Sequence, residues 1–233
     1  MYSKPQKIVA EFIGTFALVF FGAGAIVADQ FLRSGTTGQP GFGLLGIALA
    51  QGLGFGIMVT SLGHISGGHF NPAITIGFWV TRKLSTFDTL AYWVAQLGGG
   101  LAAAYLLRTL PFDAWSSVQL GTPNMAIGIP RATGIVLEAV MTFFLVFVFF
   151  ATSVNERGAF QQAAGFAVGL TVTIAVLLGG PFTGAALNPA RVLGPAIASN
   201  HWTNHGVYWI GPLGGGLVAG WLYDTIFPSK KEL

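Results

Sequence analysis

The stretch Gly184-Ala185-Ala186-Leu187-Asn188-Pro189-Ala190-Arg191 decides the fold, together with its earlier counterpart Gly67-Gly68-His69-Phe70-Asn71-Pro72-Ala73. Each stretch predicts a helix start, because an Asn side chain can cap the free N–H groups of a first turn and Pro is favoured at the first helical position. The segments that follow, Ala73 to Thr81 and Ala190 to Ala198, are apolar but only about two turns long, too short to cross a bilayer. We therefore expect two half-helices that enter a membrane without crossing it.

The composition places the chain in a membrane. Of its 233 residues, 53% are hydrophobic and only 8% are charged, whereas soluble domains carry roughly 25% charged residues. No run of basic residues is longer than two, so we expect no nucleic-acid partner. There is no Cys, and none of the four His residues has metal-ligand neighbours at a useful spacing. We therefore expect neither a metal site nor a cofactor.

The apolar segments predict six membrane spans, with a half-helix after the second and after the fifth. A cleavable signal peptide is the alternative for the first span; it is disfavoured because the segment is long, contains Glu11 and lacks a small-residue cleavage site. The expected fold is an all-α membrane protein with a single domain over residues 1–233. The spans are about Ile8–Ala28, Gly43–Leu62, Phe87–Leu107, Ala132–Thr152, Gln162–Gly180 and Gly206–Phe227.

The two halves of the chain resemble each other, with repeat one at about 5–107 and repeat two at about 131–227. Three spans per half is an odd number, so the second half must enter the membrane upside down. The pattern predicts an inverted internal repeat. The matching positions are Glu11 and Glu138, Thr15 and Thr142, Asn71 and Asn188, and Tyr92-Trp93 and Tyr208-Trp209.

The distribution of Lys and Arg predicts a multi-pass protein of the cell or inner membrane with both termini in the cytoplasm. In this orientation the outer side receives Arg33, Arg108 and Arg131. The cytoplasmic side receives Lys4, Lys7, Arg82, Lys83, Arg157, Lys230 and Lys231.

Non-helical backbone at membrane depth is tolerated only where protein buries it or water wets it. If both loops fold back to the midplane, Asn71 and Asn188 meet there, with the positive ends of two half-helices behind them. A polar wall opposite the apolar faces of spans two and five suits a file of small neutral molecules, and the positive ends and desolvation exclude cations. The backbone carbonyls expected to line this path are those of Gly67, Gly68, His69, Gly184 and Ala186.

Several side chains have two interpretations. Glu11 and Glu138 could relay protons; because the acid is duplicated, we favour a role in which each accepts hydrogen bonds from its re-entrant loop.

We expect the ring of His69 near the cytoplasmic vestibule. Glycines four apart in spans two and five predict close helix packing rather than a phosphate-binding loop. The glycine pairs are Gly52/Gly56 and Gly165/Gly169, and the expected interfacial anchors are Trp79, Tyr92, Trp202 and Trp221.

The two Asn-Pro-Ala boxes, the second extended by Arg191, the Ser66-Gly67-Gly68-His69 and Thr183-Gly184 approaches and the repeated Glu-Thr spans resemble the aquaporin (major intrinsic protein) family over essentially the whole chain. The resemblance implies a right-handed bundle of six spans with two half-helices, and a homotetramer in which each subunit has its own pore. It also implies a selectivity filter formed by Gln51, Val176, Ala185 and Arg191.

This filter differs from that of strict water channels in the family, which usually have an aromatic residue in place of Gln51 and His in place of Val176. The resemblance thus implies a channel for water and for larger neutral solutes such as urea, ammonia, glycerol or metalloid hydroxides. A strictly water-selective channel is the alternative: glycerol-conducting relatives usually have Asp where this chain has Val192, and they replace the aromatic pair that stands here as Tyr208-Trp209.

Two further classes remain open beside a passive channel. A coupled secondary transporter can also use inverted repeats and broken helices, but it would need a coupling-ion site, and the only carboxylates within the spans are Glu11 and Glu138. A junction protein with a closed pore is the other class. An enzyme is not expected, because no nucleophile, base or metal constellation is present.

Overall fold

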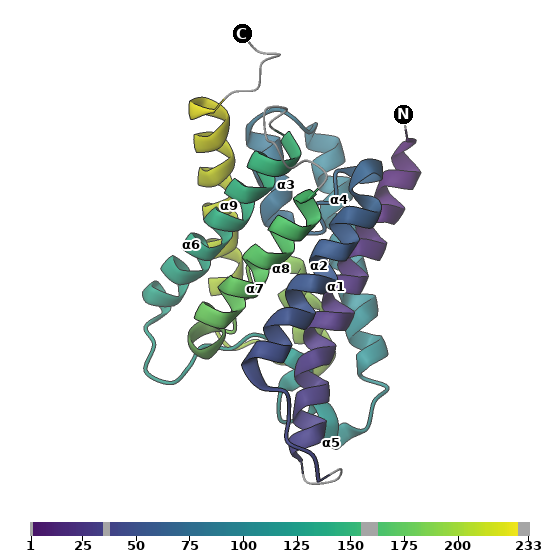
Figure 1. Cartoon of the computed structure of the whole chain (residues 1–233), viewed down its shortest axis with the longest axis vertical. Coiled ribbons are helices and arrows are strands. Elements are labelled where there is room, and N and C mark those ends of the chain that lie inside the picture. Colours follow the sequence, from purple (N-terminus) through teal and green to yellow (C-terminus); the bar gives the residue numbers. More distant parts are fainter. Residues whose placement is uncertain (1, 35–37, 155–162, 228–233) are drawn as a thin grey trace.

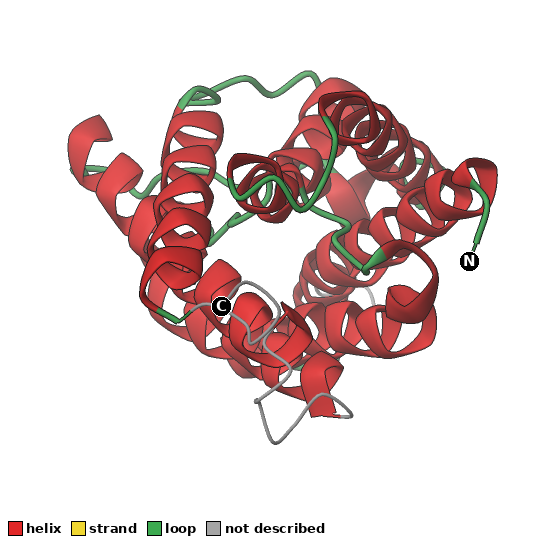
Figure 2. Ribbon diagram, turned by 90° about the horizontal axis from the view of Figure 1, so that it is seen from above, coloured by secondary structure: helices red, strands yellow, loops and turns green. Residues whose placement is uncertain are grey.

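The structure is a computed structural model that describes residues 2–34, 38–154 and 163–227, and these residues form helices and loops without any strand (Figures 1 and 2). The predicted all-α fold is confirmed. Six helices are long, and α3 (Pro72–Val80) and α8 (Pro189–Ser199) are the two half-helices. The long helices are α1 (Lys4–Arg33), α2 (Gly43–Ser66), α4 (Thr86–Leu107), α6 (Arg131–Phe149), α7 (Ala164–Thr183) and α9 (Val207–Ile226).

Helix boundaries differ from the expected ones where local contacts extend a helix. α1 begins at Lys4 rather than Ile8 because Ser3 and Gln6 form a capping box, and it continues to Arg33, which pairs with Asp29 one turn earlier at 2.8 Å. α6 is followed by a π-helical turn, η2 (Phe150–Val154). The connection from α4 to α6 contains α5 (Phe112–Trp115) and a short 3₁₀ turn, η1 (Gln119–Gly121). Four positions used in the sequence argument, Arg157, Gln162, Lys230 and Lys231, lie outside the described residues.

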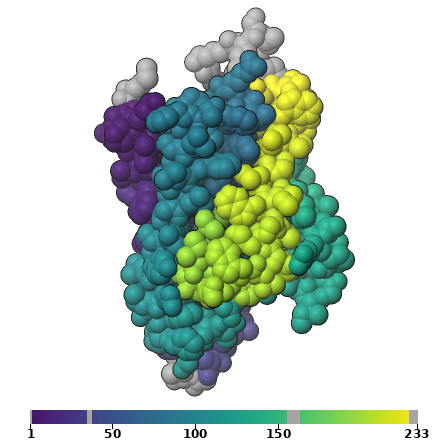
Figure 3. All heavy atoms as spheres, turned by 180° about the vertical axis from the view of Figure 1, so that it is seen from behind, coloured from purple at the N-terminus to yellow at the C-terminus, as the bar shows by residue number. Residues whose placement is uncertain are grey.

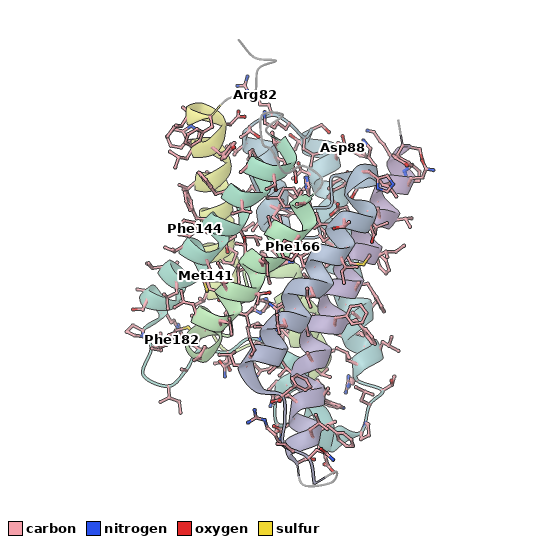
Figure 4. The ribbon with its side chains drawn as sticks, in the orientation of Figure 1. Arg82, Asp88, Met141, Phe144, Phe166 and Phe182 are labelled. Atoms are coloured by element: carbon pink, nitrogen blue, oxygen red, sulfur yellow. The ribbon has the colours of Figure 1, made fainter. Side chains whose placement is uncertain are left out.

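The long helices have the properties of membrane spans. In the described residues, five helices are long and apolar enough to cross a membrane: α1, α2, α4, α6 continued by η2, and α7. α9 has 20 residues, but its Gly, Tyr and Trp residues lower its mean hydropathy. The start of α1 and the end of α9 lie at the same end of the molecule (Figure 1), as an even number of crossings requires. Large apolar side chains such as Phe144, Phe166 and Phe182 are exposed on α6 and α7 (Figure 4), which suits contact with lipid or another subunit.

The two halves interlock through their half-helices. α1 packs along α4 in the first half, and α6 packs along α9 in the second. Each half-helix packs mainly on a long helix of the other half, α3 on α9 and α8 on α4. Figure 3 shows α8 (yellow-green) against α4 (blue-green) on one face of the molecule. The two repeats therefore pack against each other through their half-helices.

The paired glycines pack helices closely, as predicted, and the structure shows that they pack α2 against α7, a pairing that the sequence did not predict. A Cβ atom added to Gly56 would lie 2.5 Å from the carbonyl oxygen of Gly165, and one added to Gly169 would lie 2.7 Å from the carbonyl oxygen of Gly52. Side-chain atoms cannot be accommodated at these distances without moving a backbone. The crossing thus fixes the faces that α2 and α7 present to the molecule's interior.

We expect Gly56→Ala to destabilise the folded protein by ~1–3 kcal/mol, because the added methyl group pushes α2 and α7 apart. The measurement is thermal unfolding of the purified protein in detergent. Gly214→Ala is the matched control: a Cβ atom there meets nothing within 4 Å in the described part of the chain, and Ala favours the helix. Equal unfolding midpoints for the two variants would contradict the close packing.

Candidate functional site

Both half-helices begin as the sequence predicts, with Asn at the N-cap and Pro at the first helical position. The Oδ1 atom of Asn71 accepts a hydrogen bond from the N–H of Ala73 at 2.8 Å. Asn188 does the same for Ala190 at 2.9 Å. The side-chain oxygen of each Asn is therefore used inside its own half-helix.

The amide nitrogens of the same two asparagines join the loops to each other. Asn71 Nδ2 donates to the carbonyl oxygen of Leu187 at 3.0 Å, and Asn188 Nδ2 donates to the carbonyl oxygen of Phe70 at 2.9 Å. Both asparagines are buried. An amide nitrogen has two N–H donors, and each Asn uses one of them within the described residues. The structure thus brings the two boxes together and leaves one N–H donor on each Asn.

The residues that accept these bonds have a strained backbone. Phe70 has φ 47° and Leu187 has φ 53°, in the left-handed region that bulky residues rarely adopt. Such a conformation costs about 1–3 kcal/mol per residue and persists only where the surroundings hold it. The reciprocal bonds to Asn188 and Asn71 supply that hold.

Glu11 holds the first loop. Its Oε1 atom accepts hydrogen bonds from the N–H of His69 at 3.0 Å and from Ser66 Oγ at 2.7 Å. Its Oε2 atom accepts from the N–H of Phe70 at 2.7 Å. The carboxylate is fully buried, so these donors replace water around it.

Glu138 holds the second loop in the equivalent way. Its Oε1 atom accepts from the N–H of Ala186 at 3.0 Å and from Thr183 Oγ1 at 2.6 Å. Its Oε2 atom accepts from the N–H of Leu187 at 2.9 Å. It is also the acid that interacts electrostatically with the buried Arg191. The contacts are those that the favoured sequence interpretation assigned to the two acids.

Tyr92 was expected to be an interfacial anchor, and this expectation is wrong. Its side chain is buried and its hydroxyl donates to the carbonyl oxygen of Ser66 at 2.7 Å. Tyr208 donates in the same way to the carbonyl oxygen of Thr183 at 2.8 Å. Both tyrosines therefore tie the end of a long helix, α2 or α7, to a neighbouring helix. The recurrence of Tyr-Trp in both halves was the signal for this role.

The ring of His69 does not lie in a vestibule, contrary to expectation. It is buried, its Nδ1 atom lies 3.1 Å from Thr75 Oγ1, and its centroid lies 4.2 Å from that of Phe78. The same hydroxyl accepts a bond from Gln96 Nε2 at 2.9 Å, and Gln96 also donates to Glu11 at 2.7 Å. The second half has Pro212 at the position equivalent to Gln96, so this network exists only in the first half.

A cavity of about 480 Å³ opens at the end of the molecule where α2 ends. Its lining includes the exposed His64, which takes the place that the sequence analysis gave to His69. The remaining lining residues are Val59, Thr60, Gly63, Gly67, Phe78, Thr152, Ser153, Ala164 and Gly165.

A second, much narrower cavity reaches both asparagines. Its free volume is about 10 Å³, on the order of the space that one water needs. Of the four expected filter residues, Gln51 and Arg191 line this cavity, whereas Val176 and Ala185 are buried and are not among its lining residues. The cavity is lined by Leu18, Gln51, Phe55, Asn71, Leu145, Val172, Ala186, Leu187, Asn188 and Arg191.

Polar atoms without a protein partner lie at this cavity. Arg191 is buried and donates from Nη1 to the carbonyl oxygen of Gly121 at 2.7 Å, while its Nε and Nη2 atoms have no partner among the described residues. The Gln51 amide is likewise free of hydrogen bonds within that part of the chain. Sequence reasoning missed Gly121, because it lies in the irregular connection between α4 and α6. These atoms can bind a passing solute.

The loop carbonyls that were expected to line the path have no protein partner. In the described part of the chain, the expected carbonyl oxygens accept no hydrogen bond, in contrast to those of Phe70 and Leu187. These acceptors belong to Gly67, Gly68, His69, Gly184 and Ala186.

The described residues contain no group of three His, Cys, Asp or Glu side chains that could hold a metal ion.

We expect Glu138→Ala to destabilise the protein by ~3 kcal/mol, because two buried N–H groups lose a charged acceptor. Glu138→Gln retains a carbonyl oxygen and should lose less. The measurement is the thermal unfolding midpoint of each variant in detergent. The outcome that contradicts the role is an unchanged midpoint for Glu138→Ala.

The sequence matches the major intrinsic protein family over residues 2–223. Aquaporin TIP1-2 of Zea mays is 41% identical over 227 residues, which cover 97% of this chain and 87% of that protein. Aquaporin TIP2-1 of Arabidopsis thaliana is 37% identical over 229 residues, with 97% and 89% covered. The solved aquaglyceroporin of Plasmodium falciparum has the same fold, with a TM-score of 0.84 at 24% identity over 96% of this chain and 97% of that one. The chain therefore belongs to the major intrinsic protein family, and it is an integral membrane channel protein of the aquaporin type rather than an enzyme.

Proposed function

We propose that the chain conducts water and compact neutral solutes such as ammonia and urea passively, and that it excludes ions and protons. The observation that carries the proposal is the narrow cavity between the two asparagines. It combines free donors on Asn71, Asn188 and Arg191 with apolar side chains from α1, α2, α6 and α7. A molecule in it finds hydrogen bonds on one side and little to retain it on the other.

The filter residues support solutes beyond water. Gln51 offers both a donor and an acceptor, and Arg191 offers donors only. Val176 and Ala185, the other two expected filter residues, are small, apolar and buried, which favours a filter that admits larger neutral solutes. Glycerol and metalloid hydroxides also belong to the class of small neutral solutes, but they are bulkier than ammonia and urea.

Ion exclusion follows from charge and desolvation. Arg191 places a full positive charge beside the path, and the N-termini of α3 and α8 each add about half a positive charge. An ion would lose its water shell in a cavity that holds about one water. The free N–H donors of Asn71 and Asn188 orient a central water as an acceptor, which interrupts a chain of proton transfers.

The hydrogen bonding of the two acids argues against a coupled transporter. Glu11 and Glu138 accept bonds from both of their oxygens, so neither offers an unoccupied carboxylate for a coupling ion. The lining of the narrow cavity includes neither acid. A passive channel needs no such site.

The proposed assembly is a homotetramer with both termini in the cytoplasm and one pore per subunit. The exposed rings of Phe144 and Phe166 are supporting features, because they project from α6 and α7. A groove of about 520 Å³ lies on the other half, along α1 and α2. Projections on one half and a groove on the other permit a repeated heterologous contact that closes into a ring.

The proposal is tested by stopped-flow light scattering of proteoliposomes that contain the purified chain. We expect faster water, ammonia and urea flux than in protein-free vesicles, with a low activation energy for water. Water flux equal to that of protein-free vesicles would support a closed junction protein. Uptake driven uphill by a pH gradient would support a transporter.

We expect Arg191→Val to increase cation leak by about tenfold, the factor that ~1.4 kcal/mol of lost barrier gives, while water flux persists. The physical reason is loss of the full charge beside the narrow cavity. The measurement is the decay of an imposed potassium gradient in vesicles. Arg131→Val, which removes an exposed arginine at the start of α6, is the control; a leak that is the same in both variants contradicts the role of Arg191.

We expect Val176→His to reduce urea flux by about fivefold, equivalent to ~1 kcal/mol of added barrier, because the larger ring narrows the filter. The measurement is urea flux in the same vesicle assay. Ile210→His introduces the same side chain on an exposed position of α9 and serves as control. Unchanged urea flux in Val176→His would place the filter elsewhere.

A further inference from the structure

We infer that the ring of Phe55 sets the size limit of this channel, at the level of the two asparagines rather than at the outer filter. The inference rests on the proposed function, and it assigns the selection of solutes by size to a residue outside the four filter positions. Phe55 lines the narrow cavity together with Asn71 and Asn188, and its side chain is only 1% exposed.

Phe55 and Gln51 act on a solute in different ways. They lie one helical turn apart on the same face of α2, and the narrow cavity reaches both. Gln51 presents amide atoms that can exchange hydrogen bonds with a solute. Phe55 presents only carbon atoms, beside a space that holds about one water. A solute that binds at Gln51 must still fit past the ring.

The internal repeat shows how far this position departs from its counterpart. Phe55 and Val172 are separated by as many residues as Asn71 and Asn188, so they are equivalent positions of α2 and α7. Two other apolar lining residues, Leu18 and Leu145, also form an equivalent pair, and both are Leu. If position 55 had the same residue as its equivalent in the second half, it would be Val. The phenyl ring of Phe55 fills space that a Val side chain would leave open.

The surroundings prevent the ring from moving aside. Phe70 packs edge-on against Phe55, with ring centroids 6.2 Å apart, and is itself fully buried. Behind Phe70 lies Gly14, where an added Cβ atom would overlap the Phe70 ring. The glycine crossing of α2 with α7 holds the backbone on both sides of Phe55. The constriction is therefore rigid.

A rigid ring at this level changes the expected order of solutes. Water fits the cavity, and ammonia is of similar size. Glycerol carries three hydroxyl groups on three carbons and must pass the ring with its carbon chain. The small residues Val176 and Ala185 therefore do not suffice to make the chain an efficient glycerol channel.

The test compares water, urea and glycerol flux in proteoliposomes of the full chain by stopped-flow light scattering. Phe55→Val installs the residue of the equivalent position. It is expected to raise glycerol flux about tenfold relative to water flux. Phe55→Leu should raise it less and keeps the experiment interpretable if the Val variant folds poorly. Phe55→Trp should lower urea flux.

Phe149→Val is the matched control, because it also removes a buried ring. Phe149 packs against His69 and Phe78 and is not among the residues that line the narrow cavity. Its glycerol-to-water ratio should equal that of the unsubstituted chain. The inference is overturned if Phe55→Val and Phe149→Val have equal ratios, or if Gln51→Val raises the ratio and Phe55→Val does not.

The unsubstituted chain separates this inference from the proposed function. If it conducts water and Phe55→Val leaves the glycerol-to-water ratio unchanged, only the role of Phe55 fails. If neither protein accelerates water flux over protein-free vesicles, the proposed function fails and the inference fails with it.

Discussion

The reciprocal hydrogen bonds between the two loops are the interaction on which the rest of the structure depends. Each loop is a non-helical segment between a long helix and a half-helix. Unpaired backbone groups in such a segment are costly inside a membrane. Asn71 and Asn188 each cap their own half-helix with the side-chain oxygen and reach the opposite loop with the nitrogen. Loss of one Asn would leave a cap unmade in one half and a carbonyl unpaired in the other, so each Asn supports both halves.

Donors and acceptors of the loops are put to separate uses. The backbone N–H groups next to the boxes are taken up by Glu11 and Glu138, which are buried and carry the acceptors that these groups need. The carbonyls that precede them accept no hydrogen bond within the described residues. The same loop is therefore held firmly through its N–H groups while its carbonyl oxygens stay available to a solute.

Local and repeated features of this site could be predicted from the sequence. Capped half-helices, close helix packing at the paired glycines and a shared role for Glu11 and Glu138 all follow from spacing within one segment or from the matching segment of the other half. Features that depend on how distant segments meet could not be predicted. The cross-bonds use carbonyls of Phe70 and Leu187 in a strained conformation that no residue preference favours, and Gly121 meets Arg191 through an irregular connection. The burial of His69 depends on rings from α3, α4 and α6, which no short pattern reveals.

The order of synthesis determines when the hydrogen-bond partners of each loop become available. Asn71 cannot form its cross-bond until Leu187, which lies 116 residues later in the chain, has been synthesised. At roughly 5–20 residues per second, a ribosome needs on the order of ten seconds to reach it. During that interval the first loop has Glu11, Gln96 and Tyr92 from its own half, all made within the same early stretch of translation or shortly afterwards. The second loop, by contrast, is synthesised when its partners Phe70 and Asn71 and the residues that hold them already exist in the chain.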